Sequence, residues 1–299
     1  MNVPSVCAVI VTYNRKELLK ECIDALIGQK YKLSKIIIIN NCSNDGTSEM
    51  LEDMKSKYEI LYVINMEKNI GGAGGFYEGI KAAYDSKQDY IWLMDDDTIP
   101  DEEALQYLVD AGDLDEIKNW GFLCSNVVWK DNTGCLMNIP ALDYYWNNFL
   151  DKGLIKLKGT SFVSVLFKRD IIKSIGFPIK EFFIWGDDAE YTHRVTKSYE
   201  AYLVEDSKVI HKMGQNTGIS IFHEDKNRID RYFYDYRNRL YIAKKRGTKE
   251  VLKYFYLFTK NILLLTFTKN NYRFNKIKVI FKGMFNGIFF NPRIEYPEK

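Results

Sequence analysis

The sequence predicts an α/β protein with a mostly parallel, doubly wound, Rossmann-like sheet and helices on both faces of that sheet. Short runs of apolar and β-branched residues alternate with amphipathic segments from residue 6 to residue 94. Strands that are apolar on both faces are typical of parallel sheets covered by helices. With 299 residues and 46% hydrophobic content, the chain can bury one large core or two modest ones, which favours a globular enzyme over a disordered chain.

The N-terminal elements follow in the order expected of such a sheet. Each predicted strand is a short apolar run, and each predicted helix places apolar residues three or four positions apart. The predicted strands cover 6–12, 35–39, 60–64 and 90–94, and the predicted helices cover 16–28, 47–58 and 76–85.

The pattern is less regular from residue 120 to residue 180, where only 159–167 is predicted to be a strand. An aromatic loop that begins at residue 180 becomes helical toward residue 197. Two short strands at 201–204 and 208–211 and an amphipathic helix at 230–245 follow. These elements complete an expected domain over residues 1–240.

Residues 241–299 are expected to form a helical, basic and aromatic extension. The net charge of the chain is only +2, yet residues 237–299 carry 15 Lys and Arg against 3 Glu. Aromatic side chains interleaved with Lys suit an amphipathic surface in an anionic membrane interface, and packing of two tails into a homo-oligomer is the alternative. Nucleic acid is not an expected partner, because no base-stacking or groove-reading motif is present.

The cellular location expected from the sequence is the cytoplasm, at the inner face of the cell membrane. The 5 cysteines are odd in number and lack metal-ligand or redox-pair spacing. No basic segment precedes the first apolar run, and the apolar stretch near residue 263 is far shorter than the ~20 residues of a transmembrane helix. We therefore expect no signal peptide and no membrane span.

Polar clusters follow three of the predicted strands, at residues 12–15, 40–45 and 95–97. Ligands of doubly wound sheets bind outside the carboxyl ends of the strands. Three loops are therefore expected to meet at one crevice.

Three consecutive aspartates are the most informative of these clusters. In an extended segment Asp95 and Asp97 face the same way and Asp96 faces elsewhere. Two carboxylates on one side repel each other unless a cation lies between them, and Mg²⁺ or Mn²⁺ binds carboxylate and phosphate oxygens. The alternative is a solvated turn that caps a helix starting near Pro100.

A glycine-rich segment at residues 71–75 is predicted to form a turn before the third helix. It is neither a dinucleotide fingerprint, because Tyr77 occupies the place of the last glycine, nor a P-loop, because no Gly-Lys pair follows. Gly72 and Gly74 can allow close approach of a donor sugar or phosphate to the backbone, and a plain tight turn is the alternative.

A second pair of carboxylates, Asp187 and Asp188, follows four bulky apolar residues that include Trp185. An aromatic wall that desolvates a carboxylate raises its pKa and makes it a better general base near neutral pH. Capping of the following helix is the alternative. His211 ends a predicted strand, a position that suits a metal ligand.

Taken together, these segments resemble the inverting family 2 glycosyltransferases, which have the nucleotide-sugar-binding GT-A fold. The resemblance covers about residues 5–240 and rests on the segments 9–15, 41–47, 69–75, 95–97 and 185–190, followed by His211. The segments 69–76 and 234–238 are most similar to the galactofuranosyltransferase and rhamnosyltransferase branch, which builds bacterial polysaccharides on carrier lipids.

The resemblance implies a role for each site residue. Thr12, Asn14 and Arg15 would line the nucleotide pocket, and Asn40 and Asn41 would lie near the base. Asp95 and Asp97 would hold the diphosphate through Mn²⁺ or Mg²⁺, with His211 as a further metal ligand and Asp96 at the donor. Asp188, with Asp187 beside it, would be the catalytic base, and Trp185 would form a wall of the sugar site. Family members often have Asp where this chain has Asn40, whose oxygen can still accept the N3–H of uracil or thymine.

The expected function is therefore that of a metal-dependent inverting glycosyltransferase. The best candidate reaction moves galactofuranose from UDP-galactofuranose to a lipid-linked oligosaccharide acceptor during cell-surface polysaccharide synthesis. The alternatives are a dTDP-rhamnose-dependent rhamnosyltransferase, a nucleotidyltransferase and a non-catalytic module that binds nucleotide sugars.

Overall fold

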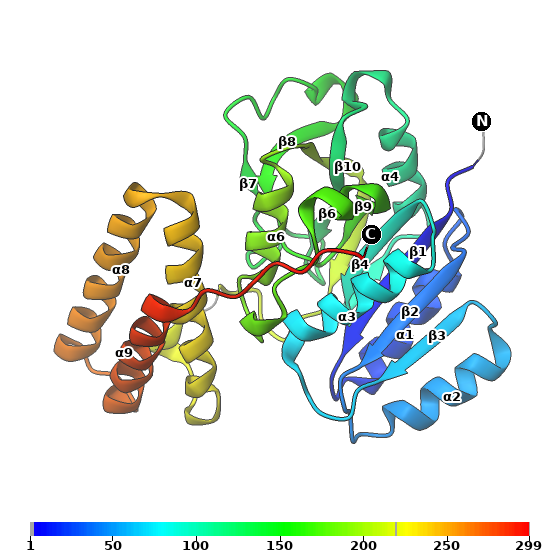
Figure 1. The fold of residues 1–299 in the computed structure, drawn as a ribbon. Helices are drawn as coiled ribbons and strands as arrows, with labels where there is room; N and C mark the ends of the chain where they lie inside the picture. Colours follow the sequence, from blue (N-terminus) through cyan, green and yellow to red (C-terminus); the bar gives the residue numbers. More distant parts are fainter. Residues whose placement is uncertain (1–2, 219, 299) are drawn as a thin grey trace.

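A computed structural model describes residues 3–218 and 220–298, which form an α/β domain with three further helices beside it (Figure 1). The strands are β1 (Val6–Thr12), β2 (Lys35–Asn40), β3 (Leu61–Asn65), β4 (Tyr90–Asp95), β5 (Thr98–Pro100), β6 (Trp120–Val128), β7 (Ala141–Leu142), β8 (Leu154–Gly159), β9 (Val165–Lys168) and β10 (Glu200–His211). The helices are α1 (Lys16–Ile27), α2 (Thr47–Lys57), α3 (Gly71–Asp85), α4 (Ala104–Gly112), α5 (Ile172–Ile175), α6 (Asp187–Val195), α7 (Tyr232–Arg246), α8 (Thr248–Phe267) and α9 (Arg273–Phe289).

The central sheet is mostly parallel, as the sequence predicts. Its strand order is β3-β2-β1-β4-β9-β6-β10-β8-β7, and β5 pairs with β10 outside this path. β3, β2, β1 and β4 run parallel, and β9 runs antiparallel between β4 and β6. In this register Val11 lies opposite Asp95 and Thr12 lies opposite Asn40, so the polar clusters that follow these strands meet at one edge.

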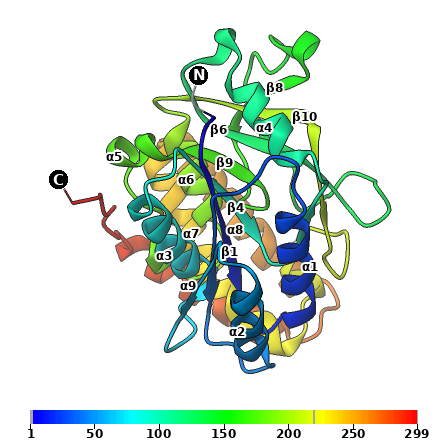
Figure 2. The ribbon, with the colours of Figure 1, turned by 90° about the vertical axis from the view of Figure 1, so that its right-hand side faces the viewer.

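Helices cover both faces of the sheet, which confirms the doubly wound arrangement. Side chains of α1, α2 and α4 pack with Ala8 and Ile10 on one face. Side chains of α3, α5 and α6 pack with Val9 and Val11 on the other face. Figure 2 shows α1 and α3 on opposite sides of β1.

Three predicted boundaries are wrong. The strand predicted at 159–167 is instead the end of β8 and the start of β9, with a turn at the intervening polar residues. The two strands predicted at 201–204 and 208–211 are one strand, β10, whose register against β6 shifts between Val204 and Lys208. The polar residues 205–207 interrupt the apolar pattern, so the sequence did not show that the strand is continuous. Ser207 is nevertheless buried, and its hydroxyl is satisfied by donating to the carbonyl of Ala104 at 2.8 Å.

The glycine-rich segment 71–75 was predicted to form a turn before the third helix, and this is wrong because these residues form the first turns of α3. A Cβ on Gly75 would lie 2.4 Å from Cγ1 of Val11, and one on Gly79 would lie 2.4 Å from Cγ1 of Val9. Glycine at these positions therefore lets α3 approach β1 closely.

The helices α7, α8 and α9 pack on one another around a core of their own, which includes Tyr236, Leu240, Phe258 and Ile280. The expected domain boundary at residue 240 falls within α7, which continues to Arg246. Among the helices that the structure describes, none is both long enough and apolar enough to cross a membrane.

The segment after α9 returns to the α/β domain and crosses its surface, as the red trace in Figure 1 shows. The amide of Phe177 donates to the carbonyl of Glu295 at 2.8 Å, and Nζ of Lys180 lies 2.6 Å from Oε1 of Glu295. The Tyr77 hydroxyl on α3 also donates to the Glu295 carboxylate.

Candidate active site

A cavity of about 670 Å³ opens at the carboxyl ends of β4 and β10 and is bordered by α6, α7 and α8. Nine of the residues predicted from the sequence line it: Arg15, Gly72, Asp95, Asp96, Asp97, Trp185, Asp187, Asp188 and His211. The structure therefore brings the two acidic clusters, which are far apart in the sequence, to one cavity.

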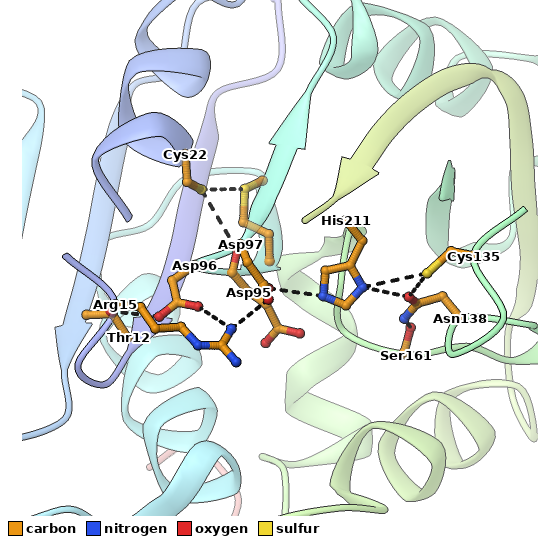
Figure 3. Close-up of polar contacts among 11 residues, drawn as sticks. Thr12, Arg15, Cys22, Asp95, Asp96, Asp97, Cys135, Asn138, Ser161 and His211 are labelled. Carbon is orange, nitrogen blue, oxygen red and sulfur yellow. Dashed lines mark hydrogen bonds and ion pairs between the residues drawn. The ribbon is translucent and has the colours of Figure 1, made fainter. Parts of the chain in front are cut away.

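Asp95, Asp97 and His211 form a compact cluster. One candidate ligand atom from each residue lies within 4.8 Å of the others, and Nε2 of His211 is 3.0 Å from Oδ1 of Asp97 (Figure 3). β10 carries His211 opposite Thr98 of β5, which follows the three aspartates directly. The strand pairing thus fixes the distance between the histidine and the carboxylates.

Asp96 faces away from this cluster, as the alternation along an extended segment predicts. Oγ1 of Thr12 donates to its Oδ2 at 2.8 Å, and Nη1 of Arg15 donates to its Oδ1 at 3.1 Å. The same guanidinium nitrogen of Arg15 also donates to Oδ2 of Asp97 at 2.6 Å. One arginine therefore offsets the charge of two of the aspartates.

Burial and mutual repulsion perturb the pKa values of these carboxyl groups. Burial, aided by the charge of Asp97, raises the pKa of Asp95 to about 7. Burial also raises the pKa of Asp96 to about 6, against the opposing charge of Arg15. Burial acts on Asp97 in the same direction, but its hydrogen bond to His211 and the charges of His211 and Arg15 outweigh burial and lower its pKa.

Two carboxylates and one imidazole fit a divalent cation. The cluster offers oxygen ligands of the kind that Mg²⁺ and Mn²⁺ bind, together with a nitrogen ligand that transition metals accept more readily than Mg²⁺ does. The raised pKa of Asp95 shows that these buried charges are not fully offset by the side chains around them. A cation bound by all three residues would remove this repulsion.

Asn138 holds the imidazole of His211 from the other side. Nδ2 of Asn138 donates to Oγ of Ser161 at 2.7 Å, which leaves Oδ1 facing Nδ1 of His211 at 2.7 Å (Figure 3). An amide oxygen can only accept, so Nδ1 of His211 carries the proton in this contact. Nε2 faces Oδ1 of Asp97 in the structure and would bind a cation after losing its own proton. Asn138 could not be predicted as a site residue from the sequence, because it lies in the irregular stretch before residue 180.

Asp187 and Asp188 begin α6 after a strained loop. Phe183 and Trp185 both have φ of 65° and Gly186 has φ of 90°, which is costly for the two aromatic residues. The side-chain amide of Asn238 on α7 donates to the carbonyls of Phe182, Ile184 and Trp185 at 3.0, 3.1 and 2.8 Å. These bonds hold the loop that presents Trp185 and the two aspartates to the cavity.

Both carboxyl groups have raised pKa values. Burial, followed by the charge of Asp188, raises the pKa of Asp187 well above its ordinary value. Burial also raises the pKa of Asp188. A buried carboxylate of this kind accepts a proton more readily than one in water.

The remaining predicted residues do not line this cavity. Thr12 orients Asp96, as described above, and Asn14 and Asn40 bond the turn after β2 through the amides of Asn44 and Ser43. Asn41 fixes the start of α3, since its Nδ2 donates to the carbonyl of Gly71 at 3.0 Å and its Oδ1 accepts from the amide of Ile70 at 2.9 Å. A Cβ on Gly74 would meet Ile70. These residues therefore hold neighbouring loops in place without lining the cavity itself.

A row of charged residues on the far wall is a second feature that the sequence analysis missed. Arg228, Arg231, Asp235, Arg239, Arg246, Glu250 and Lys253 all line the cavity from η6 (Lys226–Arg231), α7 and α8. Within each element these residues are three, four or seven positions apart, as expected for one face of each helix. That spacing was the signal in the sequence that could have revealed them.

This fold and this site define a glycosyltransferase with the GT-A fold. Residues 7–128 match the family described as Glycosyl transferase family 2, so the chain carries a family 2 glycosyltransferase domain. These findings confirm the fold, the family and the class of enzyme that the sequence predicts.

Two relatives are each 27% identical to this chain over the residues that align. The galactofuranosyltransferase GlfT1 of Mycolicibacterium smegmatis is 27% identical over 270 residues, which cover 83% of this chain and 85% of the relative. A poly-beta-1,6-N-acetyl-D-glucosamine synthase of Staphylococcus epidermidis is 27% identical over 207 residues, which cover 68% of this chain but 47% of the relative.

Solved structures share the fold. The crystal structure of GalNAc-T7 with UDP, GalNAc and Mn²⁺ superposes with a TM-score of 0.60 at 14% identity and covers 80% of this chain. The match spans 50% of the GalNAc-T7 chain. At this identity the likeness shows the GT-A architecture.

Proposed function

We propose that the chain is a metal-dependent inverting glycosyltransferase that moves a sugar from a nucleotide-sugar donor to an acceptor hydroxyl. The observation that carries this proposal is that one cavity contains both a cluster fit for a divalent cation, Asp95, Asp97 and His211, and a separate carboxylate pair, the buried Asp187 and the half-buried Asp188. Donor binding and proton removal are thereby assigned to different residues of one site.

The donor end of the cavity binds the diphosphate. Asp95, Asp97 and His211 would hold Mn²⁺ or Mg²⁺, which supplies positive charge to the diphosphate as it leaves. Arg15 lies beside these carboxylates and can turn its guanidinium toward a phosphate oxygen. Gly72, where a side chain would meet nothing within 4 Å, leaves room for the donor at the start of α3.

Asp188 acts as the general base, with Asp187 beside it. Its carboxylate takes the proton of the acceptor hydroxyl while that oxygen forms a bond to the anomeric carbon. The bond from the anomeric carbon to the diphosphate oxygen breaks, and its electron pair leaves with the nucleoside diphosphate. Attack from the face opposite the leaving group inverts the configuration, and Trp185 walls the sugar site.

The donor we propose is UDP-galactofuranose. The similarity to a relative named as a galactofuranosyltransferase over most of both chains supports this sugar above dTDP-rhamnose. GalNAc-T7, which has the same fold, was crystallised with UDP and Mn²⁺, and this supports the cation and the nucleotide.

The acceptor we propose is a glycan on a carrier lipid, reached at the inner face of the cell membrane. Support comes from the large apolar side chains that α8, α9 and their connection expose, which include Leu252, Phe255, Tyr256, Phe267, Phe274, Phe281, Phe285 and Phe289. They alternate with Lys on the same helices, a combination that suits an anionic bilayer surface.

Two variants and two readouts test this proposal. Asp97→Asn should abolish the rise in melting temperature that UDP with Mn²⁺ produces, because a ligand that binds only the folded state stabilises it. Asp188→Asn should keep that rise and lose transfer from UDP-galactofuranose by at least about 100-fold. Asp206→Asn, an exposed carboxylate outside the cavity, is the matched control.

The outcomes separate the alternatives. Near-normal transfer by Asp188→Asn would refute the assignment of the base. Stabilisation by dTDP with transfer from dTDP-rhamnose would replace the donor, and release of pyrophosphate would indicate a nucleotidyltransferase. Stabilisation without any transfer would support a binding module.

A further inference from the structure

A second cavity of about 560 Å³ adjoins the first at the proposed base. The two cavities share one wall, whose residues line both of them: Met137, Asn138, Ser161, Asp188, Ala189, Arg246, Glu250 and Lys253. None of the residues that line the second one belongs to the group Arg15, Asp95, Asp96, Asp97 and His211. The second cavity therefore reaches Asp188 from a side that the donor diphosphate and its cation do not occupy.

Basic side chains predominate in this second cavity. Lys158, His193, Arg246 and Lys253 line it, against the carboxylates of Asp188 and Glu250. The basic residues come from four elements: β8 carries Lys158, α6 carries His193, α7 carries Arg246 and α8 carries Lys253. Residues that are distant in the sequence thus converge on one concave surface.

The positive charges of the two lysines are only loosely compensated. Nζ of Lys253 is 4.0 Å from Oε2 of Glu250, and Nζ of Lys158 is 3.8 Å from Oδ2 of Asp143. Arg246 donates one hydrogen bond from Nη2 to the carbonyl of Ala189 at 3.1 Å, next to Asp188. Its remaining donors are available to an anion with several oxygens, and a phosphate is such an anion.

We propose that the second cavity is an acceptor subsite that binds a phosphate group of the acceptor through Arg246, Lys253 and Lys158. This inference rests on the proposed glycosyl transfer with Asp188 as the base. A phosphate held beside Ala189 places the attached glycan next to Asp188, and the donor approaches from the first cavity. The subsite thus selects acceptors that carry a phosphate and positions their hydroxyl for attack.

The position of α8 favours a lipid phosphate as the source of this group. α8 turns Lys253 and Glu250 to the cavity, and it exposes Leu252, Phe255 and Tyr256 elsewhere on its surface. A phosphate joined to a hydrocarbon chain could bind the lysine while its chain lies along the apolar side chains of the same helix. A phosphodiester group within a polymer could bind Lys253, but it has no hydrocarbon chain to lie along the apolar side chains of α8.

The test uses the full chain saturated with UDP and Mn²⁺, so that the first cavity is filled. Farnesyl diphosphate and glycerol 1-phosphate are titrated in separate calorimetry experiments, with gluconate as a carboxylate probe. The wild type should bind farnesyl diphosphate, and Lys253→Gln and Lys158→Gln should each weaken this binding about tenfold, the loss expected for one charge-assisted contact. Lys249→Gln, an exposed lysine of α8 outside both cavities, should bind like the wild type.

Each outcome decides one point. Binding of farnesyl diphosphate alone supports a lipid phosphate, and equal binding of glycerol 1-phosphate, with the same sensitivity to Lys253→Gln, supports a polymer phosphodiester. The phosphate subsite is overturned if the wild type binds neither phosphate probe, if gluconate binds equally well, or if Lys249→Gln loses as much affinity as Lys253→Gln. Failure of UDP and Mn²⁺ to stabilise the wild type would instead overturn the proposed function.

Discussion

At the residue scale, three consecutive aspartates have three different environments. Asp96 is bonded by Thr12 and Arg15, Asp97 is bonded by Arg15 and His211, and Asp95 is left with its raised pKa of about 7. Successive side chains of an extended segment point in opposite directions, and this places Asp96 on one side and Asp95 and Asp97 on the other. The sequence alone predicted that Asp95 and Asp97 face one way and Asp96 another, but it could not show that Arg15 bonds both Asp96 and Asp97.

The raised pKa of Asp188 leads to a prediction about pH. Burial disfavours the charged carboxylate, so Asp188 takes up a proton at a higher pH than an exposed aspartate does. The base acts only when it is deprotonated, so kcat/KM should fall as the pH falls and reach half its plateau above the ordinary aspartate pKa of about 3.9. Initial rates across the acidic range measure this, and melting temperatures at each pH control for unfolding. A flat profile down to that pKa would contradict the assignment.

The contact between Asn138 and His211 predicts an effect on metal affinity. Asn138→Ala removes the acceptor that keeps the proton on Nδ1, so the affinity for Mn²⁺ should fall about 10- to 100-fold. Asn138→Asp, which retains an oxygen at this place, should restore much of it. Electron paramagnetic resonance of free Mn²⁺ measures both, and the exposed Asn148→Ala is the control. Equal affinity in Asn138→Ala and the wild type would leave Asn138 without a positioning role.

At the element scale, α3 shows how one glycine-rich segment serves two purposes. Gly75 and Gly79 lie against Val11 and Val9 of β1, whereas Gly72 lines the cavity and faces open space. The first two glycines permit close helix–sheet packing, and the third leaves open space in the cavity. The spacing of the glycines in the sequence does not distinguish these two purposes. What distinguishes them is the distance from each glycine to its neighbours, and that distance depends on the tertiary packing.

Two substitutions on α3 should therefore differ. Gly79→Ala forces a methyl group into Val9 and should lower the free energy of unfolding by about 1–3 kcal/mol, as overpacking does. Gly72→Ala has space for its methyl group and should leave the free energy of unfolding within about 0.5 kcal/mol of the wild type. Urea unfolding measures both. A Gly79→Ala protein as stable as the wild type would mean that α3 can shift away from β1 without cost.

Prediction from the sequence succeeded where a local pattern determines the element. The apolar runs of β1, β2 and β4 and the helices between them follow from periodicity, which short-range sterics and burial impose. Prediction failed at β10, because the polar residues 205–207 interrupt its apolar pattern and Ser207 is buried by a partner distant in the sequence. Asn138 was missed for the same reason, and the contacts of Asn238 were not predicted although the segment 234–238 was singled out, since each residue acts through tertiary contacts that follow no periodic pattern in the sequence.

At the scale of the whole molecule, α7 joins the helical unit to the active site. One side of α7 packs on α8 and α9, and Tyr241 and Ile242 pack with Ala73 and Phe182 of the α/β domain. Asn238, on the same helix, holds the loop that carries Trp185. The charged wall of the cavity is thereby placed at a fixed distance from the cluster of Asp95, Asp97 and His211.

The segment after α9 adds a second connection, which can be removed by mutation. Glu295→Ala deletes the contacts with Lys180 and Tyr77 and should lower the free energy of unfolding by about 1 kcal/mol at neutral pH. Hydrogen bonds from Lys180 and Tyr77 lower the pKa of Glu295, so this contribution is present above the unfolded-state pKa and is lost as the pH falls through the folded-state pKa. Chemical unfolding at two pH values measures it, with Glu298→Ala as the control. An equal loss in both variants would contradict a specific role of Glu295.

The pairing of His211 with Asp97 joins positions 114 residues apart in the chain. During synthesis, the three aspartates leave the ribosome long before the strand that supplies the histidine. The nascent chain therefore cannot assemble this proposed cation site until β10 has emerged and paired with β5 and β6. Such long-range contacts form late and slowly, so the ability to capture Mn²⁺ would mark the completion of the sheet, before α7, α8 and α9 are in place.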